Sequence, residues 1–141
     1  MRIALATLLL AGLLGCASEE EAFCDEVEAQ QERLTEVLTG GGQDSLIRAL
    51  PSLRALQDKA PGDVRDEYAV VVDAIEGLEA ALEEAGIDPA AYDEEDLQDL
   101  PDEDEQRVRA AASTLGSRAT QTAFRGLEQQ ARDVCHTPIS L

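Results

Sequence analysis

The sequence predicts an all-α fold, a bundle of four or five helices. Apolar residues recur at steps of three or four along several segments, and this spacing places them on one face of a helix. Glycine and proline, which interrupt helices, separate these segments. No segment combines apolar–polar alternation with β-branched enrichment, so we expect no sheet.

The first two helices are expected to end near residues 38 and 59. The first begins within residues 17–22, and its apolar positions are Phe23, Val27, Leu34, Val37 and Leu38. The glycines at 40–42 end it, because glycine readily adopts the left-handed conformation found after a helix. Asp44 or Ser45 can cap the second helix, and Pro51 predicts a kink or a restart within it. Its apolar positions are Leu46, Ile47, Leu50, Leu53 and Leu56.

The third helix, over residues 63–85, has the clearest periodicity. Its apolar positions continue for about six turns, and Gly86 is its natural stop. They are Val64, Tyr68, Val71, Val72, Ile75, Leu78 and Leu82. We therefore expect this helix at the centre of the bundle.

Residues 87–101 are expected to form an acidic linker, which Asp88-Pro89 opens with a turn. The densest acidic run of the chain begins here and extends to residue 105. It consists of Asp93, Glu94, Glu95, Asp96, Asp99, Asp102, Glu103, Asp104 and Glu105. A block of like charge predicts a solvated, mobile loop.

Two further helical segments are expected over residues 102–115 and 118–134. Gly116-Ser117 predicts a break between them, and one bent helix is the alternative. The inward positions are Val108, Ala111, Ala112 and Leu115 in the former and Ala119, Ala123, Leu127, Ala131 and Val134 in the latter. Residues 136–141 include Pro138 and are expected to be irregular.

The N-terminus has the pattern of a secretion signal. Arg2 gives it a positive end, and residues 3–14 are uncharged and almost entirely apolar. This run is too short to span a bilayer, which needs about 20 residues. Its length is that of the apolar region of a secretory signal, about 7–15 residues.

Leu13-Leu14-Gly15-Cys16 resembles the lipobox of bacterial lipoproteins. Leu13, Gly15 and Cys16 match its pattern, whereas Leu14 is bulkier than the residue usually found second. The resemblance implies that residues 1–15 are a signal peptide that is removed, and that Cys16 carries a thioether-linked diacylglycerol. Residues 16–22 would then tether a helical domain, residues 23–141, to the extracytoplasmic face of the cell membrane. The alternative is an ordinary signal cut after Ala17, which would release a secreted domain.

The cysteine count fits this resemblance. The chain has three cysteines, and lipidation of Cys16 leaves Cys24 and Cys135 as a pair. Outside the cytoplasm they can form a disulfide, which would close the bundle at its termini. A loop of this length is worth about 4–5 kcal/mol in the chain-entropy model. The alternatives are two free thiols, or a metal site, for which Cys24, Cys135 and His136 offer at most three ligands without C-x-x-C spacing. We expect no metal.

The formal charge of −19 argues against several classes of partner. So acidic a chain repels the phosphates of nucleic acids, and we expect no nucleic-acid partner. It also repels anionic lipid headgroups, so membrane attachment must come from acyl chains. Charge of this size favours solubility and attracts cationic partners.

The sequence does not predict an enzyme. Its only histidine, His136, lies in the expected irregular tail, whereas a catalytic histidine is held by the scaffold. The glycines at 40–42 lack the lysine of a phosphate-binding loop. Two Phe, two Tyr and no Trp leave few aromatics for a glycosidase cleft. We expect no catalytic residues and no cofactor.

Two non-enzymatic functions remain open beside a purely structural role as a passive spacer, and the sequence favours the first. In the first, the domain is an interaction module that engages an envelope protein through a helix face or through Arg118, Arg125 and Arg132, which recur every seven residues. The simpler interpretation of this stripe is pairing with nearby carboxylates, such as Glu128 with Arg132. In the second, the domain binds a small ligand or a divalent cation, although the acidic run lacks the EF-hand order of ligands and glycine.

The whole layout also resembles the small, helical, secreted lipoproteins of high-GC Gram-positive bacteria. The shared features are a lipobox, an early cysteine, amphipathic helical segments and a cysteine near the C-terminus. Many of these proteins have no assigned function. The resemblance therefore implies an architecture and a location, and leaves the role open.

Overall fold

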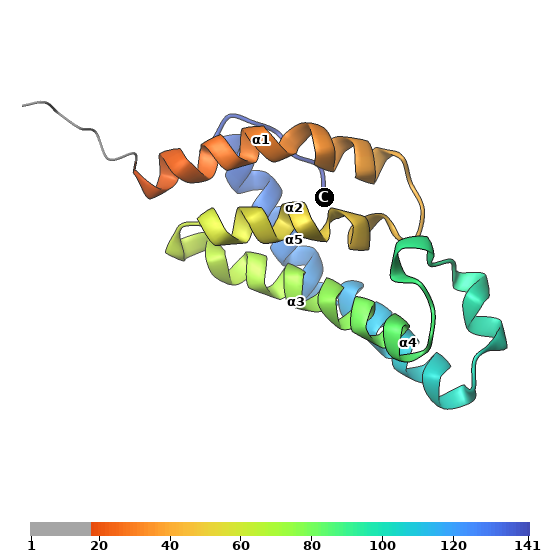
Figure 1. The fold of residues 1–141 in the computed structure, drawn as a ribbon. Helices are drawn as coiled ribbons and strands as arrows, with labels where there is room; N and C mark the ends of the chain where they lie inside the picture. Colours follow the sequence, from red (N-terminus) through yellow and green to blue (C-terminus); the bar gives the residue numbers. More distant parts are fainter. Residues whose placement is uncertain (1–17) are drawn as a thin grey trace, which may run out of the picture.

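A computed structural model describes residues 18–141, and this part of the chain contains helices and no β-strand (Figure 1). The predicted all-α bundle is confirmed. Its α-helices are α1 (Glu19–Thr39), α2 (Ser45–Lys59), α3 (Gly62–Glu84), α4 (Asp102–Leu115) and α5 (Arg118–Asp133). Two short 3-10 helices, η1 (Pro89–Ala91) and η2 (Glu94–Asp99), lie between α3 and α4.

Helix α3 is the centre of the bundle, as its periodicity predicted. Helices α1, α2 and α3 follow one another in alternating directions, with α2 between its two neighbours (Figure 1). Helix α3 packs against α2, and it also packs against both α4 and α5. Arg107 of α4 reaches Glu84 at the C-terminal end of α3, whereas Gly126 of α5 lies against Glu67 near its N-terminal end. Helices α4 and α5 therefore follow one another back along α3.

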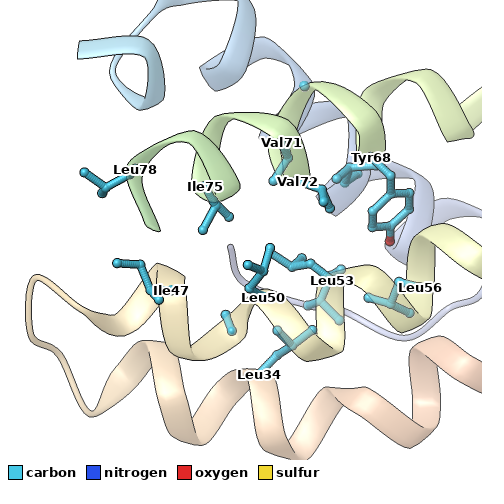
Figure 2. Packing of buried hydrophobic residues seen from close by; sticks show 14 of the residues in the cluster. Leu34, Ile47, Leu50, Leu53, Leu56, Tyr68, Val71, Val72, Ile75 and Leu78 are labelled. Carbon is cyan, nitrogen blue, oxygen red and sulfur yellow. The ribbon is translucent and has the colours of Figure 1, made fainter. Parts of the chain in front are cut away.

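The core consists of the apolar faces of these helices. Figure 2 shows the leucines of α2 between Leu34 of α1 and the apolar side chains of α3. Every predicted apolar position of α3 is buried. Phe23 of α1 meets Tyr68 of α3 edge to face, with ring centroids 6.0 Å apart. Such aromatic pairs add about 0.5–1.5 kcal/mol beyond the area that they bury.

Helix α1 begins at Glu19, within the range predicted from the sequence. Ser18 is its N-cap, and the Ser18 hydroxyl accepts a hydrogen bond from the backbone N–H of Glu21 at 3.1 Å. The glutamates at 19–21 suit the positive end of the helix dipole. Most of the segment expected to be a tether, residues 16–22, is therefore the first turn of α1.

Two predictions about helix breaks have opposite outcomes. Helix α2 continues through Pro51, which is exposed, so the restart is absent, and the alternative, a kink, stays a prediction. The predicted break at Gly116-Ser117 is present. The Ser117 hydroxyl caps α5 by accepting the N–H of Thr120, and the buried Thr120 hydroxyl donates to the carbonyl of Thr114 at 2.8 Å. Two helices, rather than one bent helix, therefore span residues 102–133.

The acidic linker, predicted to be a solvated mobile loop, is folded against the core. Its acidic side chains are exposed, but Tyr92 and Leu97 are buried. The Asp93 carboxylate accepts the N–H of Glu95, and the Asp96 carboxylate accepts the N–H of Asp93, which closes a capping box at the start of η2. The apolar side chains and these local caps fix the segment despite its charge.

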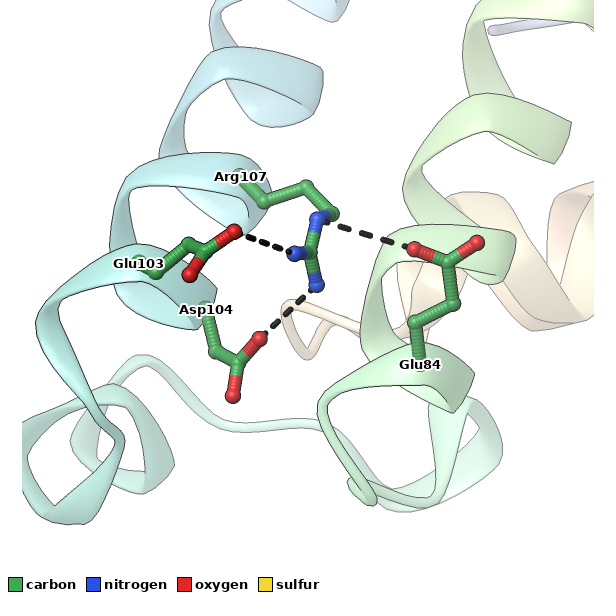
Figure 3. A network of polar contacts seen from close by, with 4 residues as sticks. All are labelled: Glu84, Glu103, Asp104 and Arg107. Atoms are coloured by element: carbon green, nitrogen blue, oxygen red, sulfur yellow. Dashed lines mark hydrogen bonds and ion pairs between the residues drawn. The ribbon is translucent and has the colours of Figure 1, made fainter.

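An arginine joins the start of α4 to the end of α3. Figure 3 shows Arg107 between three carboxylates, with Asp104 at 2.8 Å and Glu84 and Glu103 each at 3.6 Å. Its guanidinium is partly exposed, and solvent-exposed pairs are worth only about 0–1 kcal/mol. The network therefore positions the two helices more than it stabilises them.

The C-terminal tail has no helix, as expected, yet it packs back onto the bundle. Ile139 is buried. The Gln31 amide of α1 donates to the carbonyl of Pro138 at 2.7 Å, and the N–H of Leu141 donates to the Glu128 carboxylate at 2.8 Å. The tail thus connects α1 with α5 beyond the point where the cysteines meet.

Candidate functional site

Cys24 and Cys135 form a disulfide at one end of the molecule. Cys24 lies in α1 and Cys135 follows α5, and their Cα atoms are 5.0 Å apart. The predicted pairing is confirmed. Cys16, the predicted site of lipidation, lies outside the described residues together with the predicted signal peptide, residues 1–15. Within residues 18–141, no helix has the length and apolar character needed to cross a membrane.

The arginines of α5 remain at the surface without carboxylate partners. Among the described side chains of residues 18–141, which do not include that of Asp63, none of Arg118, Arg125 and Arg132 forms an ion pair. The predicted Glu128–Arg132 pair is absent, and the Glu128 carboxylate accepts the N–H of Leu141. The stripe is therefore available to a partner.

These arginines belong to an exposed strip along α5. At 100° per residue, Arg118, Thr122, Arg125, Gln129 and Arg132 fall within one narrow arc, and all five are exposed. We call these five residues the α5 face. It contains three cations and no anion, although the whole chain has a charge of −19. The α5 face is thus a basic strip on a strongly acidic protein.

The acidic run does not assemble a metal centre in the described residues. No three Cys, His, Asp or Glu side chains of residues 18–141 lie together in a way that could hold a metal ion. A hollow of about 410 Å³ beside η2 is lined by acidic side chains and by a cation, Arg109. Arg109 bonds Glu105 at 2.7 Å and lies 3.8 Å from Glu94. The hydrogen bond from Arg109 to Glu105 raises the pKa of the guanidinium.

A groove between α3 and α5 was not predicted from the sequence. It has a volume of about 320 Å³. We call it the α3–α5 groove; its lining residues are Asp66, Glu67, Val70, Ala119, Thr122, Ala123 and Gly126. Ala119, which was predicted to face the core, is exposed there. Alanine and glycine have short side chains, so this part of α5 cannot fill the space beside α3.

Two residues of α3 give the groove its chemical character. Val70 is 41% exposed, and it is the only large hydrophobic side chain of residues 18–141 with such exposure. Oε2 of Glu67 is buried without a hydrogen-bond donor in this part of the chain. A buried acceptor without a donor costs about 1–3 kcal/mol, and more when it is charged. The groove therefore combines uncovered apolar surface with an unsatisfied carboxylate.

His136 follows the disulfide directly. It is exposed, and its backbone φ of 55° lies in the left-handed region. Its side chain makes no hydrogen bond within residues 18–141.

Comparisons with known proteins identify no relative of this chain. No protein-family model matches it, no curated protein is significantly similar in sequence, and no solved structure is significantly similar in fold.

Proposed function

We propose that this protein is a lipid-anchored interaction module of the cell envelope. Diacylglycerol on Cys16 holds it at the extracytoplasmic face of the membrane, and the α5 face engages an envelope protein. The observation that carries the proposal is the Cys24–Cys135 disulfide, because it pairs two of the three cysteines and leaves Cys16 for lipid. A structural disulfide also fits an oxidising compartment outside the cytoplasm.

The position of α1 supports a domain held close to the bilayer. Residues 19–24 are helical and rise about 1.5 Å per residue. The three steps from Cys16 to Glu19 add at most about 3.6 Å each, so Cys16 lies within about 18 Å of Cys24. The disulfide brings the end of α5 to the same place. Both ends of the domain would then face the membrane.

The α5 face supports a protein partner rather than a lipid surface. From Arg132, three residues before the disulfide, to Arg118 it runs for about 21 Å at 1.5 Å per residue. It therefore leads away from the proposed membrane end. The rest of the chain is acidic and repels anionic headgroups, so the lipid anchor and not the protein surface would hold the domain at the membrane. Carboxylates of an envelope protein can pair with the three arginines in this geometry.

Replacement of the lipidated cysteine tests the anchor. We expect Cys16→Ser to move the protein from the membrane fraction to the soluble or secreted fraction of its native cells. The matched control is the double variant Cys24→Ser/Cys135→Ser, which removes two cysteines and keeps Cys16. The control should stay with the membrane. A Cys16→Ser protein that remained membrane-bound would contradict the proposed anchor.

Photocross-linking in intact cells tests the interaction surface. A photoreactive residue at Arg125 should give a defined cross-linked product, whereas the same residue at Glu28, an exposed position on α1, should not. Equal products at both positions, or none at Arg125, Arg118 and Arg132, would refute the α5 face as the partner surface.

A further inference from the structure

The α3–α5 groove lies directly beside the α5 face. Thr122 belongs to both, and its hydroxyl accepts a hydrogen bond from Arg125 at 3.3 Å. Arg125 is therefore held at the edge of the groove. The volume of about 320 Å³ lies at the small end of the range for ligand sites, about 300–1,000 Å³. The groove is thus large enough for a few side chains and is continuous with the proposed interaction surface.

The floor of the groove suits the ridge of another helix. Ala119, Ala123 and Gly126 are separated by four and three residues, so they follow one line along α5. This line is about 10.5 Å long, or two helical turns. Side chains of a second helix at the same spacing can pack into such a depression. The second helix would also cover Val70, whose apolar surface otherwise stays in water.

The groove is acidic on its α3 side and lies next to a cation of α5. The α3 wall carries Asp66 and Glu67, and Oε2 of Glu67 has no donor within the described residues. Arg125 does not line the groove, but it lies next to it on α5, where its guanidinium donates to Thr122 of the lining. A lysine or arginine of the occupant would face the carboxylates of Asp66 and Glu67 on the α3 side, and an aspartate or glutamate would meet Arg125. A second copy of this chain is a poor occupant, because two molecules of charge −19 repel each other.

We propose that the α3–α5 groove binds an amphipathic helix of a partner protein. The apolar ridge of that helix lies over Ala119, Ala123 and Gly126, a basic residue faces Glu67 and an acidic residue faces Arg125. This inference rests on the proposed interaction module and specifies the chemistry of its partner. The acidic α3 side and the neighbouring cation of α5 fix which side of the partner helix is basic and which is acidic.

Two peptides of identical composition test this polarity. Both are 14-residue helices with a ridge of alanine and leucine, one lysine and one glutamate. The lysine and the glutamate lie on opposite sides of the ridge, and their positions are exchanged in the second peptide. The mature chain in lipid nanodiscs should bind the matched peptide about tenfold more tightly than the exchanged one in fluorescence anisotropy, because the exchange replaces two attractive charge pairs, each of modest strength at the surface, by two repulsive ones. Equal affinity of the two peptides would overturn the proposal.

Variants of the groove provide the second part of the experiment. Gly126→Leu should abolish binding of the matched peptide by filling the floor. A Cβ at Gly126 lies 3.7 Å from Cγ of Glu67, an ordinary contact, so the variant should fold. Gly77→Leu is the matched control, because Gly77 is exposed on α3 with open space around it, and its binding should be unchanged. Glu67→Gln should weaken binding about tenfold. Binding retained in Gly126→Leu would overturn the proposal.

A small amine distinguishes the partner helix from a free ligand. n-Hexylammonium has the apolar stem and ammonium group of a lysine side chain. It should displace the matched peptide only weakly, because it covers neither the floor nor Arg125. If it bound as tightly as the peptide, the groove would be a site for small amines and the partner helix would be refuted. If cross-linking at Arg125 occurred but neither peptide bound, the proposal that a partner helix occupies the groove would be wrong. The proposed interaction module would not be contradicted.

Discussion

At the scale of single residues, Tyr68 contributes to the core through the packing of its ring and not through a hydrogen bond of its hydroxyl. It is the largest completely buried side chain of residues 18–141, and its hydroxyl has no hydrogen-bond partner there. Its ring packs edge to face on Phe23. Burial raises the pKa of the Tyr68 phenol well above its usual value. The ring of Tyr68 therefore stabilises the fold through its packing, whereas its buried, unpaired hydroxyl destabilises it.

Removal of this hydroxyl should not destabilise the protein. We expect Tyr68→Phe to be at least as stable as the wild type, by up to about 1–3 kcal/mol, because the variant no longer buries an unpaired polar group. Tyr68→Leu, which removes the ring, should be less stable than Tyr68→Phe. Urea titration followed by circular dichroism measures both. A clear loss of stability in Tyr68→Phe would mean that the hydroxyl has a partner.

The same residue should make stability depend on alkaline pH. Above about pH 10 the unfolded chain releases the Tyr68 proton, whereas the native chain keeps it because its pKa is raised. The free energy of unfolding therefore falls as pH rises, by about 1.4 kcal/mol per pH unit from this group. Tyr68→Phe lacks this contribution, so the stability difference between variant and wild type should grow above pH 10. A difference that stays constant between pH 8 and pH 11 would contradict the burial of the phenol.

At the scale of secondary-structure elements, buried positions can be predicted from the sequence where apolar residues recur over several turns. They are missed where no such period exists. The third helix repeats its apolar positions over about six turns, and all of them are buried. Tyr92 and Leu97 of the linker are five residues apart, which gives no apolar period, and the block of like charge around them predicted a mobile loop. In α5, Thr120 is buried in place of Ala119, because its hydroxyl bonds Thr114 and Ser117. Hydropathy alone does not reveal that a threonine is buried in place of a neighbouring alanine.

The anchoring of the linker can be tested through Leu97. Leu97→Ala should lower the free energy of unfolding by about 2–5 kcal/mol, the usual cost of removing a buried leucine side chain. Gln98→Ala is the control, because Gln98 is exposed and should change stability by less than about 0.5 kcal/mol. Thermal or urea unfolding measures the difference. Equal stability of the two variants would show that the linker is the mobile loop that its charge predicts.

At the scale of the whole molecule, the disulfide and the proposed lipid organise the chain around one end. The fold class, the central helix and the cysteine pair follow from the sequence because periodicity and cysteine number have simple physical consequences. The α3–α5 groove could not be predicted, because it arises where small residues of α5 fail to cover α3, and this depends on how two distant helices cross. The only signal in the sequence is the series Ala119, Ala123 and Gly126, which also fits a buried helix face.

The central claim is that Cys16 carries lipid while Cys24 and Cys135 close the domain, and the intact mass of the protein tests it most directly. The protein is purified under non-reducing conditions from the membranes of its native cells. We predict a chain that begins at Cys16, carries a diacylglyceryl group and gains the mass of two hydrogens on reduction. A chain that keeps Met1, or one whose mass does not change on reduction because both thiols are free, would contradict the account.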